Sequence, residues 1–469
     1  MKNYLLFTLF WSLFSQIVVA QNYHPGKENL LSSGLPLVEI ETVGGEEPTC
    51  DPIEPPEGCM GLGITNKTKV PSRMTITKGG DVLYDSGDYV KDVSGLMLSI
   101  RGNTSAALAE KKPYKIKLQK KADLLFRNGN SYKDKEWGLL KCSGNIYLNS
   151  LVGFKVNEMA GLQWTPCFLY VNVVINGDYK GVYMLMETVK DSKTRLSIDK
   201  DNGYIIEYDA YWWNEDLSLP AGQFFMWNSM RYTFKYPDAD DITQEQVDYI
   251  QGRVEEMENA VTAGNYDEYI DVPSFAAWLV AHDILGDIDG CGSNIFLTLY
   301  NSELETKFQM GNIWDLDCIE LADDDWATIH SLYGFYFKWM LESENKVFLE
   351  TYQNLWGALS PSLVEDMNSF LDDFSASEQG VGLAACLPYD NQRWGYTSMT
   401  IADEVEKNKQ WFMNRKAWLD EHVPQLSTGI HTIQQVESKS PVIYNLNGQR
   451  VAKAVKGLYI LNGKVVAVN

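Results

Sequence analysis

The chain has 469 residues, of which 45% are hydrophobic and 12% aromatic, a globular composition that can fill a large core and suggests more than one domain. Its 63 acidic and 40 basic side chains give a formal net charge of −23. A chain this acidic repels the phosphate backbone as a whole, which excludes general nucleic-acid binding. The acidity itself favours solubility.

The first twenty residues have the three-part pattern of a secretory signal peptide. Lys2 gives a positive start, residues 4–19 are mostly apolar, and Val18-Val19-Ala20 offers small residues for cleavage. The apolar stretch is short for a membrane span, although an uncleaved anchor helix is the alternative. The pattern predicts a protein exported to the periplasm, the cell surface or the medium, with no transmembrane span after cleavage.

Seven cysteines would meet an oxidising space after export, where disulfides persist. Cys50 and Cys59 flank a turn-rich loop and are candidates for a local disulfide. There is no Cys-x-x-Cys pair, which argues against a structural zinc site.

Residues 21–62 are rich in Gly, Pro and Glu, which indicates a loosely structured segment. A main domain over 63–425 follows, and its first half predicts a β-rich fold. Short apolar runs separated by Gly and Asp turns indicate a meander, and an Asn176-Gly177 turn indicates a hairpin. The expected strands are 74–77, 81–84, 95–100, 114–118, 168–175, 179–187 and 203–208, with a helix over 149–162.

The second half of this domain predicts helices. Residues 242–263 are amphipathic, and 273–285 are almost wholly apolar after a Pro at a favoured first-turn position. A hairpin over 295–300 and 307–314 interrupts the helical pattern, which resumes from 326 to about 421. The fold class is therefore α+β.

The tail over 430–469 is a separate small β module. Tyr444–Gly448 recurs as Tyr459–Gly463, so two Asn-Gly hairpins are expected. The tail is basic and resembles the C-terminal tails of exported Bacteroidetes proteins, some of which act as sorting signals for type IX secretion.

One constellation predicts chemistry. A buried helix runs into a glycine-rich loop with Asp289 and Asn294 five positions apart, and the return strand of the next hairpin ends at Asp315. Phosphoryl transfer needs a carboxylate that accepts the attacking hydroxyl's proton, which suits Asp289, and oxygen ligands that hold Mg²⁺, which suits Asn294 and Asp315. The spacing is the protein-kinase arrangement. In isolation, Asp and Asn in such loops are most often turn formers.

A kinase-like site also needs a strand lysine that contacts the phosphates of ATP. Lys115 and Lys117 lie on one face of a predicted strand, with Lys117 preferred, and Glu158 on the helix is a candidate to orient it. The alternative is that both are ordinary exposed lysines. Arg101 begins a donor-rich turn that could face phosphates, and Glu187 ends a strand near the expected adenine site.

These motifs resemble the spore-coat protein H (CotH) kinase family. The resemblance rests on residues 101–103, 112–118 and 176–183, on Asp289 with Asn294, and on Trp314-Asp315-Leu316-Asp317. It implies an atypical two-lobed protein-kinase-like fold that binds ATP and Mg²⁺ and phosphorylates a protein hydroxyl. Asp289 would be the catalytic residue, with Asp315, or else Asp317, as metal ligand.

Two features depart from the family pattern. Val152 and Gly153 stand where an arginine is expected near the start of a helix, and cysteines lie in both predicted active-site loops. If those loops meet, Cys291 and Cys318 could form a disulfide. The rival interpretation of the whole chain is a non-catalytic surface or assembly protein that keeps the fold, because ATP is scarce outside the cytoplasm. The sequence names neither the protein substrate nor an oligomeric state.

Overall fold

The computed structural model describes residues 23–59, 61–65, 67–222, 229–287, 290, 294–303, 306–319 and 335–426, and the backbone of four strands within 443–468. The chain divides into two units, Met1–Leu426 and Ser427–Asn469. The signal-peptide prediction, Asp289 and Cys291 lie outside the described residues.

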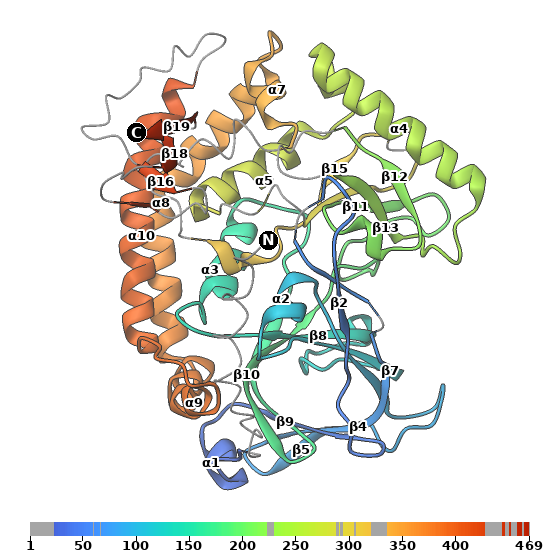
Figure 1. Ribbon diagram of the computed structural model, residues 1–469, viewed down its shortest axis with the longest axis vertical. Helices are drawn as coiled ribbons and strands as arrows, with labels where there is room; N and C mark the ends of the chain where they lie inside the picture. Colours follow the sequence, from blue (N-terminus) through green and yellow to red (C-terminus); the bar gives the residue numbers. More distant parts are fainter. Residues whose placement is uncertain are drawn as a thin grey trace, which may run out of the picture. The chain divides into compact units, whose positions relative to one another are not determined.

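The first unit begins with α1 (Lys27–Ser32) and a closed seven-stranded barrel (Figure 1). The strand order is β1-β9-β10-β8-β7-β6-β4, and β1 closes the ring by pairing with β4, while β5 extends β4. Of these pairings only β1–β9 is parallel. The strands are β1 (Leu37–Thr42), β4 (Val70–Lys78), β5 (Asp81–Asp85), β6 (Leu96–Ile100), β7 (Tyr114–Ala122), β8 (Asp134–Lys141), β9 (Phe168–Ile175) and β10 (Asp178–Glu187).

Alternation along β7 explains why it forms a barrel wall. Tyr114, Ile116 and Leu118 are buried in the barrel core, whereas Lys115 and Lys117 point out of it. β10 is buried along its whole length, because its outer face packs under helices. The predicted meander and the hairpin across Asn176-Gly177 are confirmed.

The prediction of a loosely structured segment over 21–62 is wrong for its central part. Leu37, Val38 and Ile40 of β1 are fully buried, and β1 closes the barrel. Its partner β9 begins more than a hundred residues later, and local composition carries no sign of such distant pairing. The short strands β2 (Asp51–Ile53) and β3 (Gly63–Thr65) also pair.

Cys50 and Cys59 do not form the expected disulfide. Cys50 packs against the barrel core, and the Cys59 Sγ lies 3.9 Å from the carbonyl oxygen of Ser229. The two thiols therefore contact different parts of the structure.

A second, antiparallel sheet has the order β12-β13-β11-β14-β15. Tyr204, Ile206 and Tyr208 of β11 join the core of the helical part. The alternate residues Glu207 and Asp209 lie on the opposite face, where Asp209 accepts a hydrogen bond from Thr233 at 2.9 Å. The strands are β11 (Tyr204–Asp209), β12 (Ser218–Pro220), β13 (Arg231–Tyr236), β14 (Ile295–Leu299) and β15 (Gln309–Met310).

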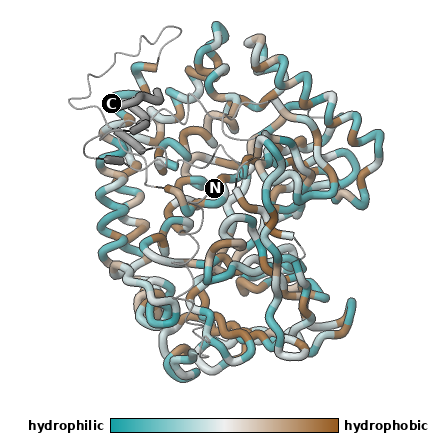
Figure 2. Tube along the Cα trace, viewed as in Figure 1, coloured by the Kyte–Doolittle hydropathy of each residue, from teal (hydrophilic) through white to brown (hydrophobic). Residues whose placement is uncertain are grey.

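Helices form the C-terminal part of this unit. The central one, α5 (Val272–Leu285), is buried on nearly every side and contacts α3, α8 and α10. Along the long outer helices, teal and brown residues alternate in Figure 2, as expected for helices with one face on the core. The others are α3 (Asn149–Met159), α4 (Gln244–Ala263), α7 (Phe337–Glu342), α8 (Val347–Ala376), α9 (Glu378–Trp394) and α10 (Ile401–His422).

A buried ion pair fastens α9 to the barrel. Lys111 is fully buried and donates to both carboxylate oxygens of Asp390, at 2.8 and 2.9 Å. It also donates to the backbone oxygens of Cys142 and Val182. Asp390 accepts from the Tyr147 hydroxyl and from the Val182 amide, so both charges are surrounded by partners.

The first unit is thus a mixed α+β structure with a β-rich N-terminal region and a helical C-terminal part, as predicted. In the second unit β16 (Ile443–Asn445), β17 (Arg450–Val451), β18 (Gly457–Leu461) and β19 (Lys464–Val468) form one sheet. The strands flanking both Asn-Gly turns pair as expected. Among the described helices, none combines the length and apolarity needed to cross a bilayer.

Candidate active site

Arg101 links the barrel to the segment that follows β15. It comes directly after β6, and its guanidinium lies 5.7 Å from the centre of the Trp314 ring. A β carbon on Gly138 of β8 would lie 3.5 Å from Arg101 Nη1, and Lys115 of β7 is the register partner of Gly138. Arg101 therefore lies beside Gly138, the register partner of Lys115, and reaches the ring of Trp314.

The hairpin of β14 and β15 brings Asn294 and Asp315 together, as predicted. Asn294 immediately precedes β14, and its Nδ2 lies 3.4 Å from Asp315 Oδ2. Both residues have left-handed backbone conformations, with φ of 62° and 58°. Such conformations are uncommon outside glycine and cluster at functional sites.

Two buried residues form a polar contact where α5 ends, and Asp289 itself lies outside the described residues. His282 Nδ1 lies 2.9 Å from Asp287 Oδ2, at the point where α5 ends. Gly290 packs so tightly that a β carbon there would lie 2.5 Å from the His282 ring. Asp287 and Gly290 are thus held against α5, while the catalytic role of Asp289 stays a prediction.

Arg101 is a cation without a complete set of partners. Its Nη1 is buried and has no hydrogen-bond partner among the described residues. Burial lowers the pKa of its guanidinium below the ordinary value, and the neighbouring Asp315 carboxylate opposes that shift. A buried donor left without an acceptor is costly, so an anion that accepted from Nη1 would be favoured there.

The two strand lysines pair with Glu136 of β8, which the sequence analysis missed. Lys115 Nζ lies 2.8 Å and Lys117 Nζ 3.7 Å from the Glu136 carboxylate. Burial alone would raise the pKa of Glu136, but the ammonium groups of Lys115, Lys190 and Lys117 lower it to about 2. The segment Asp134-Lys135-Glu136-Trp137 has no apolar–polar alternation, so the sequence carried little signal for this strand.

Glu158 does not orient either lysine, contrary to the sequence-based expectation. It lies on α3 with its side chain 64% exposed and pairs with Lys155, at 3.1 Å. The helical spacing of α3 was interpreted correctly, but sequence spacing does not determine which face of a helix meets a distant strand.

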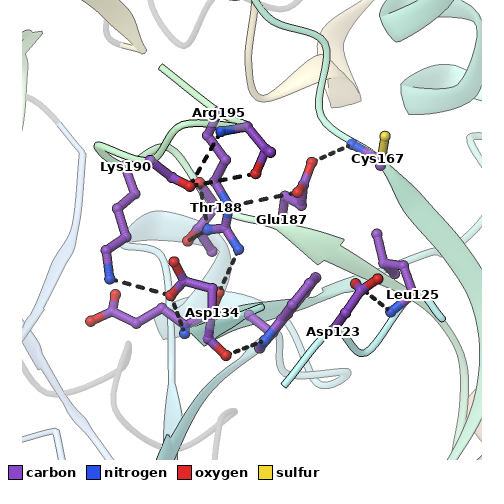
Figure 3. Close-up of polar contacts among 12 residues, drawn as sticks. Asp123, Leu125, Asp134, Cys167, Glu187, Thr188, Lys190 and Arg195 are labelled. Atoms are coloured by element: carbon purple, nitrogen blue, oxygen red, sulfur yellow. Dashed lines mark hydrogen bonds and ion pairs between the residues drawn. The ribbon is translucent and has the colours of Figure 1, made fainter. Parts of the chain in front are cut away.

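Glu187 is buried at the end of β10, in the polar cluster of Figure 3. It accepts from the Cys167 amide at 3.1 Å and from Arg127 at 2.9 Å, and the Arg195 guanidinium lies 3.7 Å away. Arg195 also donates to Thr188, the residue that follows the strand. Glu187 therefore fixes the chain that leaves the barrel, and nothing in this geometry assigns it a contact with adenine.

Asp317 is exposed on a short helical turn (Leu316–Cys318), while Leu316 between the two aspartates is buried. The expected disulfide between Cys318 and Cys291 stays a prediction, because Cys291 lies outside the described part of the chain. Leu316 packs on Gly153 of α3 so closely that a β carbon on Gly153 would overlap its Cδ1 atom. The glycine found in place of the expected arginine therefore makes room for the Asp315 segment.

Gly153→Ala is expected to disturb the site although alanine favours helices by about 1 kcal/mol. The added methyl group must displace Leu316 and with it Asp315. In the nucleotide-binding role proposed below, affinity should fall while the unfolding temperature changes little, which calorimetry and thermal unfolding would measure. A Gly252→Ala control adds the same group to α4 in open space. Equal nucleotide affinity in both variants would contradict the proposed role of Gly153.

Asp283, near the end of α5, predicts a pH dependence of stability. Burial raises its pKa to about 7, although the Tyr352 hydroxyl, which donates to Oδ2 at 2.6 Å, and Arg415 oppose the shift. Because the pKa of Asp283 is higher in the folded than in the unfolded state, the protonated carboxyl stabilises the fold. This stabilisation is fully present below about pH 4 and is lost as the pH rises through about 7.

Asp283→Asn stays neutral and keeps an acceptor for Tyr352. The unfolding free energy of the variant relative to wild type should therefore increase between about pH 4 and pH 8. Urea titrations at several pH values would measure it. A constant difference across this range would show that Asp283 does not titrate as expected.

Part of the barrel, most of the helical part and the residues around Arg101 and Asp315 fall within the span of one protein-family model. The sequence model of the CotH kinase protein family matches residues 98–419, which is more than half of the chain. The chain belongs to this family. The match includes Arg101, Lys115, Asn294 and Asp315. A comparison with curated proteins gives no match.

Proposed function

We propose that the protein is an exported protein kinase that transfers the γ-phosphoryl group of ATP to a Ser or Thr hydroxyl of a protein acceptor. The observation that carries the proposal is the meeting of Arg101, Trp314, Asp315 and Asn294, with a buried Arg101 donor that lacks a partner among the described residues. Family membership supports the same reaction class. The barrel would be the N-lobe and the helical part the C-lobe of an atypical kinase fold.

The residues present fit Mg²⁺ and ATP. Asn294 and Asp315 supply an amide and a carboxylate, and rotation of the amide would turn its oxygen toward Asp315. Mg²⁺, when bound, would offset the negative charge of the phosphates. Asp317 is adjacent and exposed, and remains a second candidate ligand.

Arg101 and Lys115 would hold phosphate oxygens. We assign this role to Lys115 rather than Lys117, because Lys115 lies opposite Gly138, beside Arg101, and Lys117 is two residues further along β7. Glu136 would take the place of the orienting carboxylate first assigned to Glu158. Its low pKa keeps it ionised at neutral pH.

Asp289 would accept the proton that the acceptor hydroxyl loses as its oxygen attacks the γ-phosphorus. The new bond joins that oxygen to phosphorus, and the bond to the β-phosphate oxygen breaks. Arg101 and Lys115 stabilise the charge carried by the phosphate oxygens during this exchange. Residues 1–20 would direct export, and the C-terminal unit would act in sorting.

Incubation with labelled ATP and Mg²⁺ or Mn²⁺ tests the proposal. Wild type should label itself or a cell-envelope extract, and Asp289→Ala or Asp315→Ala should reduce the rate by about 10²- to 10⁴-fold. Asp366→Ala, which removes an exposed carboxylate from α8, is the matched control. If wild type gives neither label transfer nor thermal stabilisation by nucleotide, the kinase proposal fails and a non-catalytic surface protein is favoured.

A further inference from the structure

A hollow of about 630 Å³ lies on the barrel between the end of β5, the end of β7 and the loop that follows β7. Four basic and two acidic side chains line it. This is a basic site on a chain whose net charge is −23. None of its lining residues belongs to the Arg101, Asn294 and Asp315 site. We call it the β7 pocket.

Both acidic groups of the β7 pocket already have arginine partners. Asp85 pairs with Arg73 at 2.6 Å, and Asp123 pairs with Arg127 at 3.0 Å. Arg73 also holds the pKa of Asp85 below its ordinary value. These carboxylates are therefore neutralised, and neither compensates the lysines of the pocket.

The lysines themselves lack anionic partners. Lys120, Lys121 and Lys133 are exposed, and among the described residues none of their side chains makes an ion pair or a hydrogen bond. Elsewhere on the barrel face, Lys115 and Lys117 share Glu136. Three uncompensated ammonium groups around one hollow create a local positive potential that selects negative ligands.

Apolar side chains accompany these charges. Phe126 is 37% exposed and Val93 is 62% exposed, and both line the pocket. Phe126 also has a left-handed backbone with φ of 58°, which is a genuine outlier for a bulky residue. A free inorganic anion would use the lysines but would leave the aromatic and aliphatic surface without a partner.

One wall of the pocket is held by hydrogen bonds that reach Glu187, a buried residue of β10. Asp123 accepts from the backbone amides of Leu125 and Arg127, and Arg127 continues to Glu187 at 2.9 Å. Asp123 with Leu125, and Glu187, can be followed in Figure 3. A wall already held by hydrogen bonds loses less conformational entropy when a ligand binds.

We propose that the β7 pocket binds an acidic segment of the protein acceptor, with carboxylates at Lys120, Lys121 and Lys133 and an apolar side chain against Phe126. The volume suits a few residues of an extended peptide. This identification of the occupant rests on the proposed kinase function. A docking site of this kind would select acceptor proteins by a segment separate from the residue that is phosphorylated. It would also offset the repulsion that an acidic acceptor meets elsewhere on this acidic protein.

Fluorescence anisotropy of a labelled peptide rich in Asp and Glu with one Phe tests the proposal on the full-length protein without nucleotide. Lys120→Glu with Lys133→Glu should weaken binding at least tenfold, and Phe126→Ala should weaken it less. Lys69→Glu with Lys307→Glu is the charge-matched control on exposed lysines outside the pocket. A peptide with Gln and Asn in place of the acids should not bind. Lys120→Gln with Lys133→Gln checks the result with a milder change.

Equal losses in the pocket and control variants would show a general charge effect and overturn the proposal. The proposal would also be overturned if vesicles of anionic lipid competed with the peptide and bound through the same lysines, because the site would then face a membrane. The absence of peptide binding by wild type would overturn it as well. Because no nucleotide is present, these outcomes are independent of whether ATP is turned over.

Discussion

Replacing Asp390 with asparagine is expected to lower the free energy of unfolding by about 3 to 5 kcal/mol. The carboxylate is the counter-charge of Lys111, and both side chains are fully buried. The variant leaves an ammonium group in the interior that two backbone oxygens, of Cys142 and Val182, cannot neutralise. Urea unfolding of the full-length protein would measure the change. Asp366→Asn, which changes an exposed residue of α8, is the control.

The double variant Lys111→Met with Asp390→Leu separates charge from packing. It should cost less than the sum of the two single changes, because no buried charge is left without a partner. If Asp390→Asn unfolded at the wild-type urea concentration, the ion pair would not be what holds α9 to the barrel.

Replacing Arg101 with glutamine is expected to weaken ATP binding by about 10- to 100-fold, the loss of one charge-assisted hydrogen bond. Stability without nucleotide should stay near the wild-type value or rise, because Nη1 has no partner among the described residues and burial disfavours the charge. Titration calorimetry with ATP analogues and thermal unfolding of the nucleotide-free protein measure the two effects.

Arg101→Lys is the informative companion variant. It keeps the positive charge beside Asp315 but loses the planar group over Trp314, so it should restore only part of the affinity. A structural role for Arg101 would give the reverse pattern, with lower stability and unchanged nucleotide affinity. That result would remove Arg101 from the proposed phosphate site.

Much of the fold was predictable from periodicity. The alternation of residues 114–118 gave a strand with lysines on one face, and the all-apolar run after Pro273 gave the buried helix α5. The hairpin that returns from Asn294 to Asp315 was also predictable, and with it their proximity. These features depend on contacts within about twenty residues, where pattern and turn chemistry act directly.

Partnerships between distant segments were not predictable. β1 was taken for part of a loose segment, Glu158 was chosen in place of Glu136, and nothing in the sequence indicated that Lys111 is buried. In each case the outcome depends on which face meets an element far along the chain. The residues around Lys111 give no indication that it pairs with a buried aspartate 279 residues away.

The amino-acid sequence by itself determined the family-defining motifs, the strand-rich first half and helical second half, and the residue types available for phosphoryl transfer. Only the tertiary structure decided that the strands close into a barrel, that Arg101 lies beside Gly138 and near Trp314, and that uncompensated lysines line a pocket at the end of β7. The physical reason is that residue pattern dictates which face of an element is apolar. How those faces pack then decides which charged groups gain partners, which stay without one, and where a pocket forms.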